Sequence, residues 1–264
     1  ITGGRVTSYV QRTSWEDQRD TGVFTPYLGA VYDLGLHWST YASYTQIFNP
    51  QSSRDVQGRR LDPESGSNME LGLKGSFHEG RLNVAAAVFE TRKDDMAVVD
   101  GRLLTPEGDQ AYRAEDGVKA RGIELEVSGQ LAPGWQVATG FTHVLIRGKD
   151  GRLLNTGYIP KQMFKLFTTW RPGSALPGLT LGGGLTAQTA VFESDSSSYP
   201  DAVLAQYRQG GRVVWNLMAR YQVNRNFDVS VNLANGGDKR YRTQIMQHNI
   251  GAPRNLTVGL RYRI

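Results

Sequence analysis

The C-terminal segment RNLTVGLRYRI, residues 254–264, alternates strictly between two kinds of side chain. Its apolar or aromatic positions are Leu256, Val258, Leu260, Tyr262 and Ile264, and the residues between them are polar, charged or glycine. A period of two residues predicts a β-strand with one apolar and one polar face. The same alternation recurs in NMELGLKGSF, GIELEVSG, VVWNLMARYQ and FDVSVNL.

Looser alternation predicts further strands at 26–33, 36–48, 81–98, 135–147, 160–171 and 178–190, and another near 5–12. Together these segments predict about 12 strands, and no segment has the 3.6-residue period of an amphipathic helix. The chain is therefore expected to be all-β.

The predicted connections alternate between two lengths. Short, turn-like connections rich in Gly, Pro and Asn fall at 33–36, 78–80, 131–134, 172–178 and 223–226. Long ones fall at about 49–66, 99–116, 148–159, 191–210 and 236–252. In an antiparallel up-and-down meander, this order puts every short turn at one end and every long loop at the other. That asymmetry is typical of transmembrane β-barrels of the outer membrane.

A soluble β-sandwich binding module is the alternative architecture, because its strands alternate as well. Sandwich strands are mostly five or six residues long, whereas several strands here reach about ten, the length of a tilted membrane-crossing strand. Greek-key connections also give no reason for long loops at one end only. The pattern therefore favours the barrel, with its apolar face against lipid.

Composition and charge change this picture little. The mean hydropathy of −0.43 is compatible with a barrel, which is apolar only at every second residue. The net charge is +5, but Lys and Arg are scattered singly, so we expect no nucleic-acid partner.

Candidate chemistry is sparse. The four histidines, His37, His78, His143 and His248, lie far apart and lack metal-ligand spacing. No nucleophile elbow or phosphate-binding glycine loop is present. We expect no enzyme activity, no catalytic residues and no protein-bound metal or cofactor.

Several segments resemble the barrel of TonB-dependent ferric-siderophore receptors. They are, in the family's order, FTPYLGAVYDL, STYASYTQIFNPQ, LDPESGSNMELGLKG, GRLNVAAAVFETRKDDMA and GIELEVSGQLAPGWQVATGFTH. VNLANGGDKRY resembles the family's N-L-F-D-K-x-Y pattern, and GAPRN its G-x-P-R-N lead into the last strand. Two departures are Gly236–Gly237, where the family's Phe is missing, and Ile264, where the family normally ends in an aromatic residue.

The resemblance implies a multi-pass β-barrel in the outer membrane of a Gram-negative bacterium. Such receptors have about 22 strands and an N-terminal plug domain that contacts the TonB complex. No segment here resembles the plug. We therefore expect residues 1–264 to be the C-terminal half of the barrel, with the plug domain and the N-terminal strands absent from this sequence.

The function implied by the resemblance is TonB-dependent uptake of ferric siderophores, with haem or cobalamin as alternative nutrients. A siderophore wraps Fe(III) with its own oxygens, so the receptor supplies no metal ligands. The family binds its ligand with aromatic and basic side chains of the long loops, and the candidates here are Phe48, Tyr112, Arg113, Tyr158, Phe192, Tyr199 and Tyr207. Aromatic girdles at the membrane interface are the alternative role for such aromatics.

Overall fold

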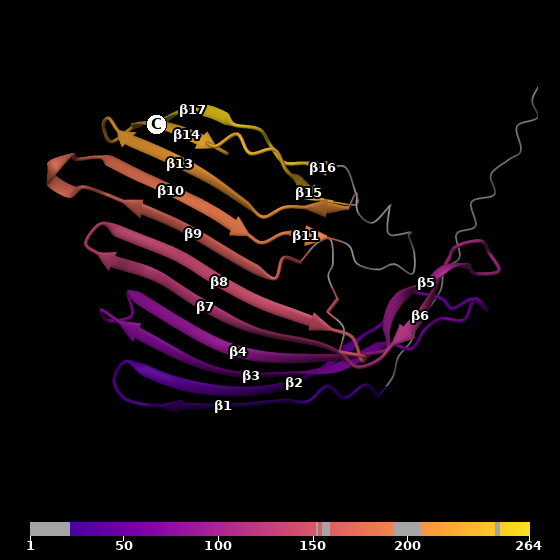
Figure 1. Ribbon diagram of the computed structural model, residues 1–264. Coiled ribbons are helices and arrows are strands. Elements are labelled where there is room, and N and C mark those ends of the chain that lie inside the picture. Colours follow the sequence, from indigo (N-terminus) through magenta and orange to yellow (C-terminus); the bar gives the residue numbers. More distant parts are fainter. Residues whose placement is uncertain (1–21, 152, 155–158, 193–206, 246–248) are drawn as a thin grey trace, which may run out of the picture.

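In this computed structural model, most of the protein forms one large antiparallel β-sheet (Figure 1). The structure describes residues 22–151, 153–154, 159–192, 207–245 and 249–264. The main sheet has 11 strands, and their order in the sheet follows their order in the chain. They are β1 (Tyr27–Asp33), β2 (Trp38–Asn49), β3 (Glu64–Phe77), β4 (Leu82–Asp94), β7 (Val118–Ala132), β8 (Trp135–Arg147), β9 (Gln162–Trp170), β10 (Leu179–Gln188), β13 (Arg212–Gln222), β14 (Phe227–Ala234) and β17 (Asn255–Tyr262).

The short turns and the long loops lie at opposite ends of this sheet, as predicted (Figure 1). Three long loops carry two-stranded hairpins of their own, which the sequence pattern did not predict. These hairpins are β5 (Met96–Leu104) with β6 (Gln110–Glu115), β11 (Val191–Phe192) with β12 (Arg208–Gln209), and β15 (Arg242–Gln244) with β16 (Asn249–Ile250). One short connection contains a 3-10 turn, η1 (Gly173–Ala175).

Each strand predicted between residues 26 and 264 has a counterpart in the sheet. The predicted strand at 5–12 lies outside the described residues. The prediction of one strand over 81–98 was wrong, because the strand is interrupted at Asp95, which has φ +58°. Strand β4 ends at Asp94, and β5 leaves the main sheet to pair with β6. Residues 91–95 are all polar and include no Gly or Pro, so periodicity alone could not locate this break.

The apolar face of the sheet is not covered by the described part of the chain. Leu71, Val258 and Leu260 are 56%, 61% and 70% exposed. Among the described residues, the buried hydrophobic side chains are only Ala87, Ala111, Val118, Val191 and Ile245. A β-sandwich would bury this face against a second sheet. The sandwich alternative is therefore wrong, and the single open sheet corresponds to an unclosed part of a barrel.

The strand register assigns the two faces residue by residue. Leu71 pairs with Ala42 and Val88, and Val88 pairs with Ile123, so one apolar row crosses β2, β3, β4 and β7. A similar row crosses β13, β14 and β17 through Ala219, Val231 and Val258. Among the described residues, no helix is long and apolar enough to cross a membrane.

Aromatic side chains gather on the apolar face near the short turns. The register places Trp38, Phe77, Trp135, Trp170, Tyr221 and Tyr262 there. The Trp38 and Phe77 rings meet edge to face at 5.3 Å. The Trp135 indole donates a hydrogen bond to the Thr168 hydroxyl at 2.8 Å. Such a row has the composition of an aromatic girdle at a membrane interface.

Candidate functional site

The long loops form two clusters at their end of the sheet. In the first cluster, the β2–β3 loop packs on the β5–β6 hairpin. The Tyr112 amide donates to the Arg54 carbonyl at 2.7 Å, and the Gln51 side-chain amide donates to the Asp95 carbonyl at 2.8 Å. Gly58 lies beside Pro106, which a Cβ at position 58 would approach to 3.2 Å. These contacts fix the hairpin relative to the loop.

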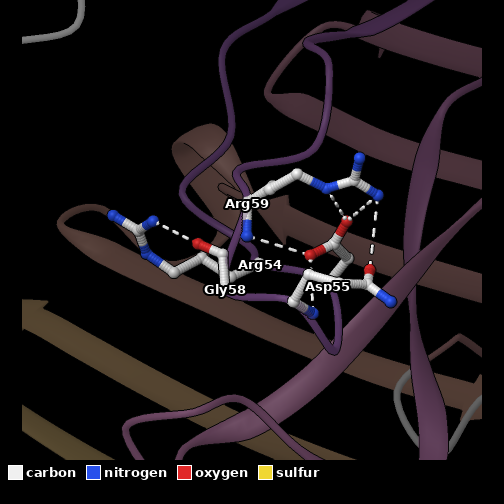
Figure 2. A network of polar contacts seen from close by, with 5 residues as sticks. Arg54, Asp55, Gly58 and Arg59 are labelled. Atoms are coloured by element: carbon white, nitrogen blue, oxygen red, sulfur yellow. Dashed lines mark hydrogen bonds and ion pairs between the residues drawn. The ribbon is translucent and has the colours of Figure 1, made fainter.

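The tip of the β2–β3 loop is organised by Asp55 (Figure 2). Its Oδ1 accepts hydrogen bonds from the backbone amides of Gln57 and Arg59 at 3.0 and 2.9 Å. The Arg59 guanidinium pairs with Oδ2 at 2.8 Å, and Arg54 donates to the Gly58 carbonyl at 2.6 Å. Desolvation raises the pKa of Asp55, but the bonds from Arg59 and Gln57 outweigh it, so the pKa is lowered.

Acidification is expected to loosen this tip. Because the folded-state pKa of Asp55 is lowered, its contribution is complete above the ordinary carboxyl pKa and is lost as the pH falls through the lowered value. Asp55→Asn should reproduce the acidic state at neutral pH. We expect the amides of Gln57 and Arg59 to exchange about tenfold faster with deuterium in this variant.

The matched control is Asp62→Asn. Asp62 is an exposed carboxylate of the same loop, and its side chain accepts no hydrogen bond from the described residues. Equal acceleration in both variants would contradict the assignment of the tip's order to Asp55.

The second cluster surrounds the β11–β12 hairpin. The Phe192 ring has the Lys161 ammonium 5.9 Å and the Arg208 guanidinium 5.6 Å from its centroid. Arg208 is the cross-strand partner of Phe192, whereas Lys161 precedes β9. At these distances the negative face of an aromatic ring attracts a cation electrostatically. The cluster therefore offers an aromatic surface with positive charge on it.

The β15–β16 hairpin joins this second cluster. The Gln209 side chain bonds the Arg242 backbone twice, to the amide at 2.6 Å and the carbonyl at 3.1 Å. The Arg212 guanidinium lies 4.6 Å from the centroid of the Tyr241 ring. Three loops thus contribute basic and aromatic groups to one region: the β8–β9, β10–β13 and β14–β17 connections.

The predicted ligand-binding residues divide between the two clusters. Tyr112 and Arg113 lie on β6 in the first, where Arg113 is 3.4 Å from Glu115 and 3.9 Å from Asp100. Phe192 and Tyr207 lie in the second. Strand β4 precedes the β5–β6 hairpin and strand β10 precedes the β11–β12 hairpin. These two strands are four positions apart in the main sheet.

Phe48 does not join either cluster. It pairs with Ser65 and shares the face of Ala42 and Tyr44, which is the apolar face. That placement favours the alternative role of an interface aromatic. Tyr158 and Tyr199 lie outside the described residues.

Sequence reasoning missed three cations of the second cluster, Lys161, Arg208 and Arg212, and the aromatic ring of Tyr241. The available signal was the position of Arg208 directly after Tyr207 in a long predicted loop. The pairing of Arg212 with Tyr241 had no local signal, because two strands and a turn separate them in the chain.

The polar face of the sheet carries its own charged network. The Tyr41 hydroxyl donates to the Glu70 carboxylate, and the Lys74 ammonium lies 4.6 Å from the Tyr41 ring centroid. Glu124 and Glu126 are exposed on the same face. Among the described residues, no group of three or more His, Cys, Asp or Glu side chains is placed to hold a metal ion.

Comparison with known proteins identifies the sheet. The family described as TonB dependent receptor-like, beta-barrel, matches residues 1–235. The ferripyoverdine receptor of Pseudomonas aeruginosa is 39% identical over 98% of this chain and 33% of its own length. The ferric-pyoverdine BN7/BN8 receptor of Pseudomonas putida is 39% identical over 93% of this chain and 29% of its own length.

Solved structures agree with this match. The ferripyoverdine receptor of the outer membrane of Pseudomonas aeruginosa, bound to ferripyoverdine, superposes with a TM-score of 0.79 at 35% identity, over 93% of this chain and 33% of that one. The alcaligin outer membrane receptor of Bordetella pertussis superposes with a TM-score of 0.66 at 36% identity, over 91% of this chain and 36% of that one. The chain thus spans about a third of the length of the curated relatives it matches. It belongs to the β-barrel of the TonB-dependent receptors, an outer-membrane family of Gram-negative bacteria.

Proposed function

We propose that this chain is the C-terminal half of the barrel of a receptor that takes up ferric siderophores of the pyoverdine class. The observation that carries the proposal is the 39% identity, over nearly the whole chain, to receptors named for ferric pyoverdine. In this proposal the apolar face contacts outer-membrane lipid. The polar face, with Glu70, Lys74, Glu124, Glu126 and Arg220, faces the barrel lumen and a plug domain that couples to TonB.

The ligand would meet the loop clusters first. A ferric siderophore presents oxygen atoms with partial or full negative charge around the iron, and often an apolar or aromatic portion. Phe192 with Lys161 and Arg208 supplies an aromatic face and two cations within 6 Å of it. Arg113 on the β5–β6 hairpin supplies an exposed guanidinium at the other cluster. The protein supplies no metal ligand in this scheme, because the siderophore keeps the iron.

Uptake is the direct test of this function. The complete receptor containing this chain would be expressed in cells that lack their own ferripyoverdine receptor and grow under iron limitation. Growth on ferripyoverdine as the sole iron source, lost when TonB is deleted, is the expected result. Growth on haem, or uptake of cobalamin, without a response to ferripyoverdine would show that the receptor takes up that nutrient and not a siderophore.

Phe192→Ala tests the second cluster. We expect ferripyoverdine to bind the complete receptor about tenfold more weakly. The substitution removes an aromatic contact, and it also removes the ring that orders the Lys161 and Arg208 side chains. Titration of the purified receptor by tryptophan fluorescence would measure the dissociation constant. Phe77→Ala removes the same side chain at the short-turn end and should leave affinity unchanged. Unchanged affinity in Phe192→Ala would mean that the ligand binds elsewhere among the loops. The result of the uptake experiment would still stand.

A further inference from the structure

The sequence contains a single Asn–Gly dipeptide, Asn235–Gly236, directly after strand β14. Asparagine followed by glycine is especially prone to deamidation, because glycine has no side chain to shield its backbone nitrogen. In that reaction the glycine nitrogen bonds to the Asn side-chain carbon Cγ, the Cγ–Nδ2 bond breaks, and ammonia leaves with the proton of the glycine amide. Water then opens the cyclic imide at either carbonyl, which leaves aspartate or isoaspartate.

In the folded chain, hydrogen bonds hold each reacting group of this dipeptide. The Gly236 amide, which is the nucleophile, donates to the Trp215 carbonyl at 2.9 Å. The Asn235 Nδ2, which is the leaving group, donates to the carbonyls of Lys239 and Ala252 at 2.9 and 3.0 Å. The Asn235 Oδ1 accepts the Lys239 amide at 2.9 Å. Asn235 is only 3% exposed, so the water that must open the imide is excluded as well.

Strand β13 holds the dipeptide from a second side. The Trp215 ring lies against Gly236, where an added Cβ would come within 2.2 Å of it. The Asn216 Oδ1 accepts the Asn235 amide at 2.9 Å. The dipeptide is therefore fixed between β13 and residues 235–254, which we call the β14–β17 loop. Attack at Asn235 requires that this unit open first, so the rate of deamidation is limited by local unfolding.

Deamidation would remove the contacts that protect the site. An ionised aspartate has no N–H group to donate, so the carbonyls of Lys239 and Ala252 would face a carboxylate oxygen in a buried position. Isoaspartate would also add one atom to the backbone, because Cβ enters the main chain. Lys239 and Ala252 bracket the β15–β16 hairpin in the chain. A modified loop would therefore lose the closure that positions this hairpin.

We propose that Asn235 is a deamidation site protected by the closed β14–β17 loop, and that its conversion releases the β15–β16 hairpin from the second cluster. Two contacts join the hairpin region to that cluster: the Gln209 side chain on the Arg242 backbone, and the Arg212 guanidinium 4.6 Å from the Tyr241 ring centroid. Loss of ammonia makes the conversion one-way, so the modified residue records that the loop has opened. The proposal makes no use of the siderophore.

Peptide mapping by mass spectrometry tests the protection. The complete receptor is incubated at mildly alkaline pH, once folded in detergent and once unfolded in guanidinium chloride, and the conversion of Asn235 is followed with time. We expect conversion to be at least about tenfold slower in the folded receptor, because the loop must open before the Gly236 nitrogen can attack. Equal rates in the folded and the unfolded receptor would overturn the protection.

Asn235→Asp tests the release, because it places the deamidated side chain in the chain directly. Hydrogen–deuterium exchange should become about tenfold faster at two backbone amides of the hairpin region. They are the Arg242 amide, which donates to the Gln209 side chain, and the Gly251 amide, which donates to the Tyr241 carbonyl at 2.8 Å. If this variant fails to fold, Asn235→Ser, which also removes the amide donors but adds no charge, supplies the exchange comparison.

Asn224→Asp is the matched control. It makes the same change in the β13–β14 turn, where the Asn224 Oδ1 accepts the amides of Asn226 and Phe227 at 2.9 Å each. A carboxylate accepts these amides equally well, so the control should leave exchange of the hairpin amides unchanged. Unchanged exchange in Asn235→Asp, or equal acceleration in Asn224→Asp, would overturn the release.

Discussion

Val258→Arg is expected to destabilise the complete receptor barrel by about 2–4 kcal/mol. Val258 lies near the middle of β17, pairs with Val231 and is 61% exposed on the apolar face. In the membrane, an Arg at this position would place a guanidinium in the hydrocarbon, where neither water nor a carboxylate is available to it. Unfolding of the receptor from lipid vesicles by guanidinium chloride, followed by tryptophan fluorescence, would measure the change in the free energy of unfolding.

Thr257→Arg is the matched control. It introduces the same side chain one residue away, on the polar face, where Thr257 pairs with Asn232. A charge facing the lumen keeps its hydration, so we expect a loss below about 1 kcal/mol. Similar losses at positions 257 and 258 would contradict the assignment of the apolar face to lipid.

Strand positions were predictable from sequence because each residue's environment follows from its place in a period of two. In β17 and β13 every second side chain faces away from the polar side, and no distant packing partner is needed to produce that pattern. A soluble sheet would add a second layer whose contacts no local pattern specifies. In the proposed barrel, lipid takes the place of that second layer, so local alternation was enough to predict most of the strands.

The loops were less predictable because their structure depends on contacts between distant segments. Strands β5 and β6 pair with each other, and the Tyr112 amide of β6 also bonds the Arg54 carbonyl of another loop. Nothing in the sequence near Tyr112 specifies Arg54 as its partner. The same holds for Phe192: its aromatic character was visible, but the cations beside it come from Lys161 and Arg208. The candidate aromatics could therefore be named, but not grouped.

The departure at Gly236 has a structural counterpart. Asn235, 3% exposed, donates to the carbonyls of Lys239 and Ala252 and accepts the Lys239 amide, which closes the loop after β14. The Trp215 ring lies against Gly236, where a Cβ would come within 2.2 Å of it. The sequence alone showed that the family's Phe was missing. It did not show that a tryptophan from β13 lies against the backbone there.

Gly129→Ala is the second substitution with a large expected effect. Gly129, on β7, has φ +123°, and an added Cβ would lie 2.0 Å from the Arg81 carbonyl oxygen. That oxygen accepts the Gln130 amide at 2.8 Å, so it cannot withdraw without loss of a hydrogen bond. Backbone strain of about 1–3 kcal/mol and overpacking of similar size should together cost about 2–5 kcal/mol.

Gly140→Ala, on the neighbouring strand β8, separates this clash from any general effect of replacing a sheet glycine. The nearest atom to its added Cβ is the Leu125 carbonyl oxygen at 3.8 Å, an ordinary contact. Because alanine also restricts the unfolded chain, we expect Gly140→Ala to change stability by less than about 1 kcal/mol, in either direction. Denaturant unfolding of both variants in the complete receptor gives the comparison. If Gly129→Ala were as stable as Gly140→Ala, the β3–β4 turn that carries Arg81 would have to relax more freely than its hydrogen bond to Gln130 allows, and the close approach of Arg81 to Gly129 would not constrain the barrel.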